Sequence, residues 1–245
     1  MAESGPSEKV PETQTVALVS FQEYVALVAD YLTILPDDID SVVIGPVLCA
    51  GLTAYKAVLN CQLKLGDWLV VVGAGDGLGH LAVQYGRAQG ALVFGIDEGQ
   101  GKRDYIMSLD ASDFIDFTAS SDLIGDVMRI TNGCAHAVVV TSGNAKAFAR
   151  AADMLRINGT LSCVGIPPGK AFIETPVSSM VIKGLRITGN LVGSLTECLE
   201  AVELVKRGIV KPKIEVRPFR DLPAVYEELE KGKITGRVVL KIAKD

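Results

Sequence analysis

The chain has 245 residues, of which 49% are hydrophobic and 22% are charged, and its formal net charge is −5. This composition is typical of a folded protein with one or two domains and excludes a mainly disordered chain. Because lysine and arginine are not clustered, we expect neither a nucleic-acid partner nor binding to an anionic membrane. No run of about 18 apolar residues occurs, so the sequence also predicts no transmembrane helix.

The N-terminal segment and the cysteines bear on location. Residues 1–15 are polar and lack the apolar core of a secretory signal, so we expect a disordered leader. The cysteines form no C-x-x-C pair, which favours free thiols and a cytoplasmic protein over a disulfide framework. The five are scattered along the chain: Cys49, Cys61, Cys134, Cys163 and Cys198.

Most of the chain alternates between two kinds of segment. Residues 41–61 are rather apolar and predict one long helix. After them, short runs rich in valine and isoleucine recur, and runs that are apolar on both faces are typical of buried parallel strands. We expect strands at 68–73, 91–96, 113–117, 136–141, 159–165 and 185–190.

Segments with helical periodicity lie between these strands, for example at 78–87, 122–130 and 197–205. Strands alternating with helices of roughly 10–15 residues predict βαβ units. We therefore expect an α/β fold of the Rossmann class, with a doubly wound parallel sheet. Residues 211–245 depart from the alternation, with an extended stretch at 213–218, a helix at 222–231 and a last strand at 236–242.

The strongest chemical signal is WLVVVGAGDGLGHLAVQ at residues 68–84, in which a strand, a glycine loop and a helix start follow one another. This order is the context of dinucleotide binding. Glycines let the backbone turn tightly and approach a pyrophosphate, and a helix N-terminus offers free N–H groups. A tight turn that holds no ligand is the alternative interpretation.

Two acidic residues near this loop have opposite implications. Asp97 closes the second predicted strand, 18 positions after Gly79, where an acid can accept hydrogen bonds from a ribose and repel a 2′-phosphate. NAD is therefore favoured over NADP, although Lys102 and Arg103 weaken that preference; a solvated loop carboxylate is the alternative. Asp76, inside the loop, would oppose a bound anion. We expect its side chain to cap the helix or to point to solvent.

The loop and its surroundings resemble the zinc-dependent alcohol dehydrogenases of the medium-chain dehydrogenase/reductase superfamily, most closely the yeast and fungal type. The resemblance implies an NAD-binding Rossmann domain at 41–210, with incomplete remnants of a GroES-like catalytic domain at 16–40 and 211–245. It is carried by GPVLCAGLTAYKA at 45–57, by the glycine loop and helix to Tyr85, and by segments at 95–97, 115–117, 158–160, 164–167 and 236–238.

The same resemblance implies roles for individual residues. Asp97 and Lys102 would hold the adenosine ribose, and Arg237 would reach the pyrophosphate. Val164 and Val192 would lie near the nicotinamide, or are simply ends of core strands. Thr53 is a weak catalytic candidate that would face the nicotinamide; Tyr55, Thr141 and Ser142 are weaker still. The pyrophosphate loop itself would comprise Gly73, Gly75, Gly77, Leu78 and Gly79.

Cys49 matches a ligand of the catalytic zinc in these enzymes. In this family the other two zinc ligands, a cysteine and a histidine, belong to the N-terminal catalytic domain, and the resemblance implies only a remnant of that domain here. The only histidines are His80 and His136, and Cys61 lies twelve residues after Cys49. We therefore expect no complete zinc site and interpret Cys49 as a free, buried thiol.

These features give one main functional interpretation and two alternatives. The resemblance implies an NAD-dependent oxidoreductase that transfers hydride between an alcohol or carbonyl substrate and nicotinamide, without a complete zinc site. The alternatives are a non-catalytic NAD-binding pseudoenzyme or interaction subunit, and a truncated gene product. Because the sixth strand builds the dimer sheet in such enzymes, residues 185–192 would allow a homo-oligomer.

Overall fold

The computed structural model describes Phe21 and residues 32–242, and every structural statement below concerns these residues. The predicted leader at 1–15 lies outside them, as does most of the predicted remnant at 16–40.

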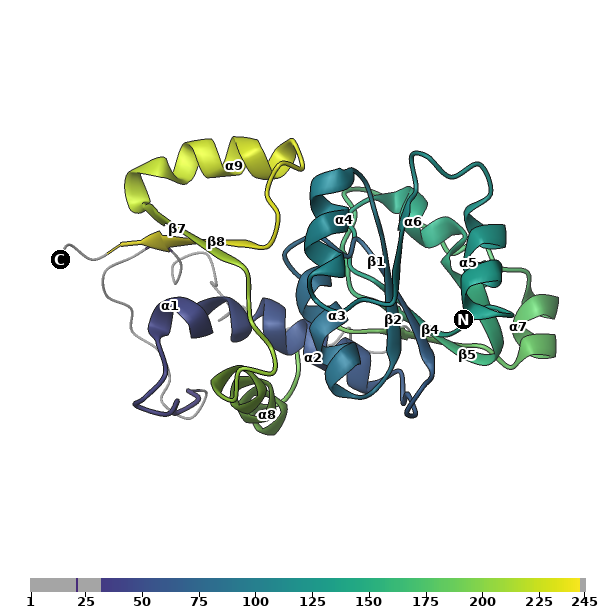
Figure 1. The fold of residues 1–245 in the computed structure, drawn as a ribbon, viewed down its shortest axis with the longest axis horizontal. Helices are drawn as coiled ribbons and strands as arrows, with labels where there is room; N and C mark the ends of the chain where they lie inside the picture. The colour runs from purple at the N-terminus through teal and green to yellow at the C-terminus, as the bar shows by residue number, and fades with distance from the viewer. Residues whose placement is uncertain (1–20, 22–31, 243–245) are drawn as a thin grey trace, which may run out of the picture.

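A six-stranded sheet forms the centre of the structure (Figure 1). Its order is β3-β2-β1-β4-β5-β6, and all five neighbouring pairs are parallel. The chain therefore starts in the middle and winds outward in both directions, which is the Rossmann arrangement and confirms the predicted fold class. The strands are β1 Trp68–Val72, β2 Leu92–Asp97, β3 Asp113–Asp116, β4 Ala135–Val140, β5 Leu155–Cys163 and β6 Arg186–Gly189.

Helices connect these strands and cover both faces of the sheet. The helices predicted at 78–87, 122–130 and 197–205 are present, and three further helices between the strands had not been predicted. Two helix starts follow directly from capping residues, since Asp122 accepts the N–H of Gly125 and Ser194 forms a capping box with Glu197. The helices are α3 Gly79–Ala88, α4 Gln100–Met107, α5 Leu123–Thr131, α6 Ala145–Ala149, α7 Val177–Lys183 and α8 Leu195–Lys206.

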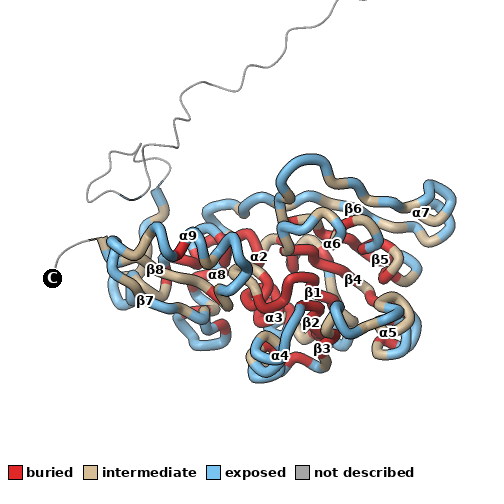
Figure 2. The backbone as a smooth tube through the Cα atoms, turned by 90° about the horizontal axis from the view of Figure 1, so that it is seen from above, coloured by how far each residue is buried: buried red, intermediate tan, exposed pale blue. Residues whose placement is uncertain are grey.

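The apolar runs of β1, β2 and β4 are buried on both faces, because successive strand residues point to opposite sides of the sheet, whereas the outer strand β6 is mostly exposed. In β1, Leu69 and Val71 belong to the core under α2 (Ala50–Leu59) and α3, and Val70 and Val72 belong to the core on the other face. Figure 2 shows β1 and its neighbouring strands buried, together with α2 and α3 beside them.

The single long helix predicted at 41–61 is wrong. The segment forms α1 Ser41–Ile44, the short 3₁₀ helix η3 Gly45–Val47, and α2, and its two halves are bent by 48°. Pro46 lies in η3, where α1 has ended, because it has no N–H group to donate to a continuing helix. The bend itself falls at the turn of Leu48 and Cys49. Cys49 then leaves helical geometry, with φ −119° and ψ −70°.

Residues 214–241 form a second, smaller unit that lies apart from the large sheet in both views (Figures 1 and 2). It consists of β7 Ile214–Pro218, a short 3₁₀ helix, α9 Leu222–Glu230 and β8 Arg237–Lys241. β7 and β8 pair in parallel, with α9 as the crossover between them. All three predicted elements of this segment are confirmed.

Among the helices of the described residues, no single one is long and apolar enough to cross a membrane. The bent segment from Ser41 to Leu59 has the length and composition for it only as a pair of helices, and most of α2 is buried in the core.

Candidate functional site

The glycine loop runs from the end of β1 to the start of α3. Gly73 adopts a φ of 84°, and its N–H donates to the carbonyl of Ile96 on β2. A Cβ added at Gly79 would lie 1.9 Å from the carbonyl oxygen of Gly73, which is an impossible contact. Glycine is therefore required at Gly79 because the start of α3 passes directly over the end of β1.

Three consecutive backbone N–H groups at this turn have no hydrogen-bond acceptor among the described residues. They belong to Gly77, Leu78 and Gly79, and no side chain caps α3 at Leu78. Unpaired N–H groups at a helix N-terminus attract an anion, since the helix dipole adds a partial positive charge there. The turn has the chemistry of a phosphate-binding site.

Arg237 reaches this turn from the second sheet. The N–H of Gly236 donates to the carbonyl of Gly75 over 3.3 Å, and the Arg237 N–H donates to that of Lys213 over 2.8 Å. A Cβ added at Gly77 would lie 2.7 Å from Nη1 of Arg237, so the guanidinium rests against the loop. Burial lowers the pKa of Arg237. No carboxylate of residues 32–242 forms an ion pair with it, which leaves its charge available to an anion.

Asp97 is buried at the end of β2, beside the loop. Its Oδ2 accepts the N–H of Gly75, and its Oδ1 accepts both the N–H of Glu98 and the Nζ of Lys102, each over 2.8–2.9 Å. The carboxylate thus lies where the sequence predicts a ribose acceptor, next to the predicted phosphate site.

Asp76 takes one of the two expected orientations only in part, since its side chain is partly exposed to solvent. It does not cap α3, and it does not simply point to solvent, because its Oδ1 accepts from the Nζ of Lys102 over 2.8 Å. Partial burial and the neighbouring Asp97 raise the pKa of Asp76. The nearby ammonium explains the difference, since it offers the carboxylate a charged partner that the helix N–H groups do not.

Two side chains of α3 hold the linker that leads to the second sheet, and the sequence interpretation missed both. His80 bonds to the carbonyl of Asp76 through Nδ1 and accepts the N–H of Lys213 at Nε2. Its ring is fully buried, and burial lowers the pKa of His80 to about 4. The neutral ring is required here, because only a neutral imidazole can accept at one nitrogen and donate at the other.

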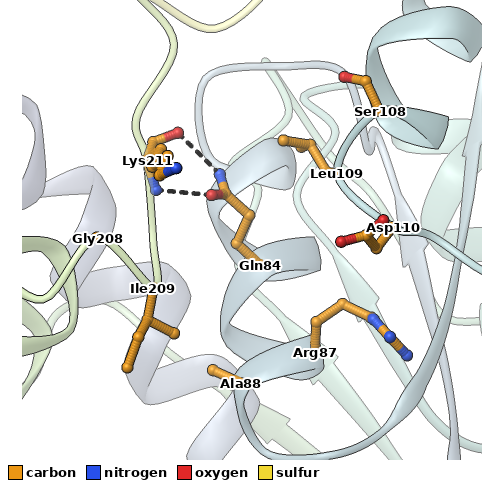
Figure 3. Close-up of a pocket in the computed structure, with 9 residues that line it drawn as sticks. All are labelled: Gln84, Arg87, Ala88, Ser108, Leu109, Asp110, Gly208, Ile209 and Lys211. Carbon is orange, nitrogen blue, oxygen red and sulfur yellow. Dashed lines mark hydrogen bonds between the residues drawn. The ribbon is translucent and has the colours of Figure 1, made fainter.

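Gln84 repeats this contact one turn later. Its amide donates to the carbonyl of Lys211 over 3.1 Å and accepts the N–H of Lys211 over 2.7 Å (Figure 3). His80 and Gln84 are four residues apart and therefore share one face of α3. The four-residue spacing of these two polar residues on α3 was the available sequence signal for a docking face.

A cavity of about 390 Å³ opens beside the Gln84–Lys211 contact (Figure 3). It lies at the other end of α3 from the glycine loop, and it contains none of the predicted site residues. Its lining consists of Gln84, Arg87, Ala88, Ser108, Leu109, Asp110, Gly208, Ile209 and Lys211.

The two valines expected near a nicotinamide lie just beyond the ends of β5 and β6. Val164 is buried directly after β5, and Val192 is exposed after β6. Thr53 is buried on α2, and its hydroxyl contacts the carbonyls of Cys49 and Leu191. The structure therefore brings Thr53 to the segment that contains Val192, with its hydroxyl bonded to backbone.

The weaker polar candidates are also bonded within the protein. The hydroxyl of Thr141 donates to the carbonyls of Val72 and Gly73 at the end of β1. The phenol of Tyr55 donates to Glu200 over 2.8 Å, and burial together with this carboxylate raises the pKa of Tyr55 to about 12. Ser142 follows Thr141, and its Oγ accepts the N–H of Asn144.

Cys49 is a free thiol as expected, but it is exposed rather than buried. The reason is the turn between η3 and α2, which places Cys49 just before α2 instead of on the packed face of a helix. The residues that the structure describes contain no group of three or more His, Cys, Asp or Glu side chains that could hold a metal ion. The donors around Cys49 therefore do not fit a zinc site with three protein ligands. All five cysteines are free.

Comparison with known proteins places these features in one family. The family model of zinc-binding dehydrogenases matches residues 77–207. The chain is 39% identical over 225 residues to an alcohol dehydrogenase of Schizosaccharomyces pombe, covering 92% of this chain and 64% of that protein. It is 37% identical over 225 residues to alcohol dehydrogenase 1 of Emericella nidulans, covering 91% of this chain and 64% of that protein.

Solved structures agree with the sequence comparisons. The alcohol dehydrogenase of Aeropyrum pernix has a TM-score of 0.77 and 30% identity, covering 84% of this chain and 60% of that one. A structure of an NAD-dependent alcohol dehydrogenase has a TM-score of 0.81 at 24% identity, covering 91% and 65%, and is similar in fold. The chain spans about 64% of the length of its curated relatives. Since the family model covers more than half of its residues, the chain belongs to the family of zinc-binding dehydrogenases.

Proposed function

We propose that the chain binds NAD and is an oxidoreductase of the alcohol dehydrogenase type. The observation that carries this proposal is the convergence of three unpaired N–H groups and the guanidinium of Arg237 at one turn, with buried Asp97 beside it. A dinucleotide needs both kinds of binding group: an anion site for its pyrophosphate and a hydrogen-bond acceptor for its ribose hydroxyls. The alcohol dehydrogenases among the relatives support the reaction type.

Each group has a defined part in this proposal. The N–H groups of Gly77, Leu78 and Gly79 bind the pyrophosphate from one side and Arg237 binds it from the other. Gly73 and Gly75 keep the loop close enough for that contact. When bound, the nicotinamide supplies the hydride acceptor or donor.

The remaining candidates serve the two ends of the cofactor. Asp97 accepts from the adenosine ribose, with Lys102 as the neighbouring donor, and the carboxylate favours NAD over NADP. Val164 and Val192 form apolar walls for the nicotinamide, and Thr53 keeps α2 next to the segment of Val192. The substrate is a small alcohol or carbonyl compound. No step is assigned to zinc, because Cys49 has no partner ligands among residues 32–242.

Calorimetric titration with NAD tests the binding step. We expect the Asp97→Ala variant to bind NAD at least tenfold more weakly than the wild type, since a hydrogen bond to a charged group contributes about 1.5–3 kcal/mol. Arg237→Gln is expected to lose a similar amount for the same reason. Glu98→Gln is the matched control, because Glu98 is exposed and adjacent to Asp97. Equal affinity of wild type and Asp97→Ala would refute the proposal.

Turnover tests the oxidoreductase activity separately. NADH formation and consumption are measured with panels of alcohols and aldehydes, with and without added zinc. Turnover that disappears in Asp97→Ala supports the proposal. Tight NAD binding without any turnover would instead make the chain a non-catalytic dinucleotide-binding protein.

We propose three parts for the chain. Residues 41–210 form the NAD-binding domain, and residues 16–40 and 211–245 belong to the catalytic domain of the family. The separate sheet of β7 and β8 supports this division. Limited proteolysis is expected to cut near residue 210 before it cuts within the large sheet.

We propose that β6 mediates a homo-oligomer. It is the outer strand of the six-stranded sheet, and an outer strand presents unpaired backbone groups to a second chain. Apolar side chains beside it are exposed, among them Val181, Ile182 and Leu191. Light scattering is expected to give a dimer or larger species that Ile187→Asp dissociates, and a strict monomer would refute the proposal.

A cytoplasmic location is part of the proposal. It is supported by the five free cysteines, since a reducing compartment keeps thiols unpaired. Fractionation of cells with an antibody to the chain tests it, and enrichment in an organelle or membrane fraction would contradict it.

A further inference from the structure

Asp76 is the one acidic residue of the glycine loop, and it is part of an ion cluster. The Nζ of Lys102 lies 2.8 Å from Oδ1 of Asp76 and 2.8 Å from Oδ1 of Asp97. The ammonium and Asp97 are nearly buried, with 13% and 5% of their side chains exposed, whereas Asp76 is 41% exposed. Two carboxylates therefore share one ammonium, and the cluster carries a net charge of about −1 at neutral pH.

The path of the Lys102 side chain places this cluster at the cofactor site. A Cβ added at Gly75 would lie 2.7 Å from Cδ and 2.8 Å from Cγ of Lys102, so the stem crosses the loop at Gly75. The N–H of Gly75 in turn donates to Asp97. The ammonium is therefore held at the proposed ribose acceptor, where a 2′-phosphate of NADP would need a cation.

We propose that Asp76 is a second specificity-determining residue, which keeps Lys102 from a 2′-phosphate by holding its ammonium between two carboxylates. The inference rests on the proposed dinucleotide binding. Asp97 repels a 2′-phosphate by its own charge, and Asp76 removes the cation that would compensate for it. Asp76 also places negative charge beside the pyrophosphate, so it weakens the binding of every dinucleotide to some extent.

This role makes a specific prediction about ligand charge. A 2′-phosphate adds about −1.5 to −2 charges at neutral pH, so freeing Lys102 benefits it more than it benefits an unmodified ribose. In Asp76→Asn we expect binding of ADP-ribose to strengthen roughly threefold and binding of 2′-phospho-ADP-ribose roughly thirtyfold. The selectivity between the two ligands would thus fall by about tenfold.

The experiment is calorimetric titration of the wild type, Asp76→Asn and Glu98→Gln with ADP-ribose and with 2′-phospho-ADP-ribose. Glu98→Gln is the control, because it removes the same charge near the cluster without contacting Lys102. Circular dichroism verifies that each variant is folded. A Lys102→Met change in the Asp76→Asn background is expected to abolish the gain for the 2′-phosphate ligand.

The outcomes separate this inference from the proposed function. A fall in selectivity between the two ligands in Asp76→Asn that is absent in Glu98→Gln supports the inference. Binding of 2′-phospho-ADP-ribose that becomes measurable only in Asp76→Asn supports it as well. The inference would be refuted if Asp76→Asn changed the affinity for both ligands by the same factor, or if Glu98→Gln changed the selectivity equally. Either result would leave the proposed NAD binding intact. Failure of the wild type and all variants to bind either ligand would refute the proposed function together with this inference.

Discussion

Two glycines of the loop are required for different reasons. At Gly79 an added Cβ would meet the backbone oxygen of Gly73, which cannot move without displacing β1. At Gly77 it would meet the end of the Arg237 side chain, which is flexible. Gly79 is therefore required for the fold, whereas Gly77 is required for the close approach of a charged group.

A substitution at Gly79 should consequently lower the stability of the whole chain. We expect Gly79→Ala to reduce the free energy of unfolding by about 3 kcal/mol or more, because backbone must shift to accommodate the methyl group. The control is Gly101→Ala, since Gly101 lies in α4 with no atom within 4 Å of an added Cβ. That variant should gain about 0.5–1 kcal/mol. Urea unfolding measures both, and equal effects would contradict this account.

At the scale of secondary structure, α3 joins the two sheets. Its N-terminus forms the candidate phosphate site, while His80 and Gln84 bind the backbone of the linker before β7. The same linker accepts the N–H of Arg237 at Lys213. The position of Arg237 over the loop therefore depends on contacts made by α3 itself.

The buried His80 predicts that stability falls in acid. Its pKa is about 4 in the folded chain and about 6.5 when unfolded, so the unfolded state binds the proton more readily. The contribution of His80 is fully present above pH 6.5 and is lost as the pH falls toward 4. Between pH 7.5 and pH 5 we expect this group to cost about 2 kcal/mol of unfolding free energy.

The measurement is urea unfolding at both pH values for wild type and His80→Gln. The stability advantage of the wild type should shrink by about 2 kcal/mol at the lower pH. His136→Gln is the matched control, because His136 is the only other histidine and is partly exposed. An advantage of the wild type that is the same at both pH values would exclude this assignment.

The Gln84 contact predicts a local rather than a global effect. Gln84→Ala removes two hydrogen bonds to Lys211, each worth about 1 kcal/mol. Hydrogen exchange of the linker and β7 should therefore accelerate by roughly tenfold or more, while exchange in β1 and β4 stays unchanged. Gln89→Ala, at the C-cap of the same helix, serves as control. Uniform acceleration throughout the chain would contradict the docking role.

At the scale of the whole molecule, one large sheet carries most of the core and a small sheet supplies Arg237. The small unit has little core of its own, with Val216, Tyr226 and Leu229 each about half exposed and only Val225 buried in α9. The chain spans about 64% of the length of its curated relatives. Isolated exposed apolar residues are normal on a protein surface, so these residues alone define no contact surface.

The positions of the possible metal ligands predict that zinc does not stabilise this chain. All five cysteines and both histidines lie within residues 32–242, where no three possible ligands come together. We therefore expect the melting temperature to change by less than about 1 °C with zinc or with a chelator, because binding to the folded state is what raises it. A fall of several degrees on chelation, prevented by zinc, would show that a site forms around Cys49 after all.

Local patterns account for what could be predicted of the fold. The strands from β1 to β6 were predicted within a few residues, because buried parallel strands read as apolar runs between glycine-rich turns. The continuous helix at 41–61 failed because apolar character alone does not reveal the bend at Leu48 and Cys49, just after Pro46. The glycine loop and Asp97 were also evident, since both follow directly after strands whose ends meet at one edge of the sheet.

The sequence by itself determined the parallel sheet, the glycine loop and the acidic residue beside it, because each depends on neighbours a few positions away. Only the tertiary structure decided that Lys102 bridges Asp76 and Asp97, that His80 and Gln84 hold the linker, and that Arg237 lies over Gly77. Those contacts join segments that are distant along the chain. Their geometry follows from how α3, α4 and β8 pack, which no local pattern contains.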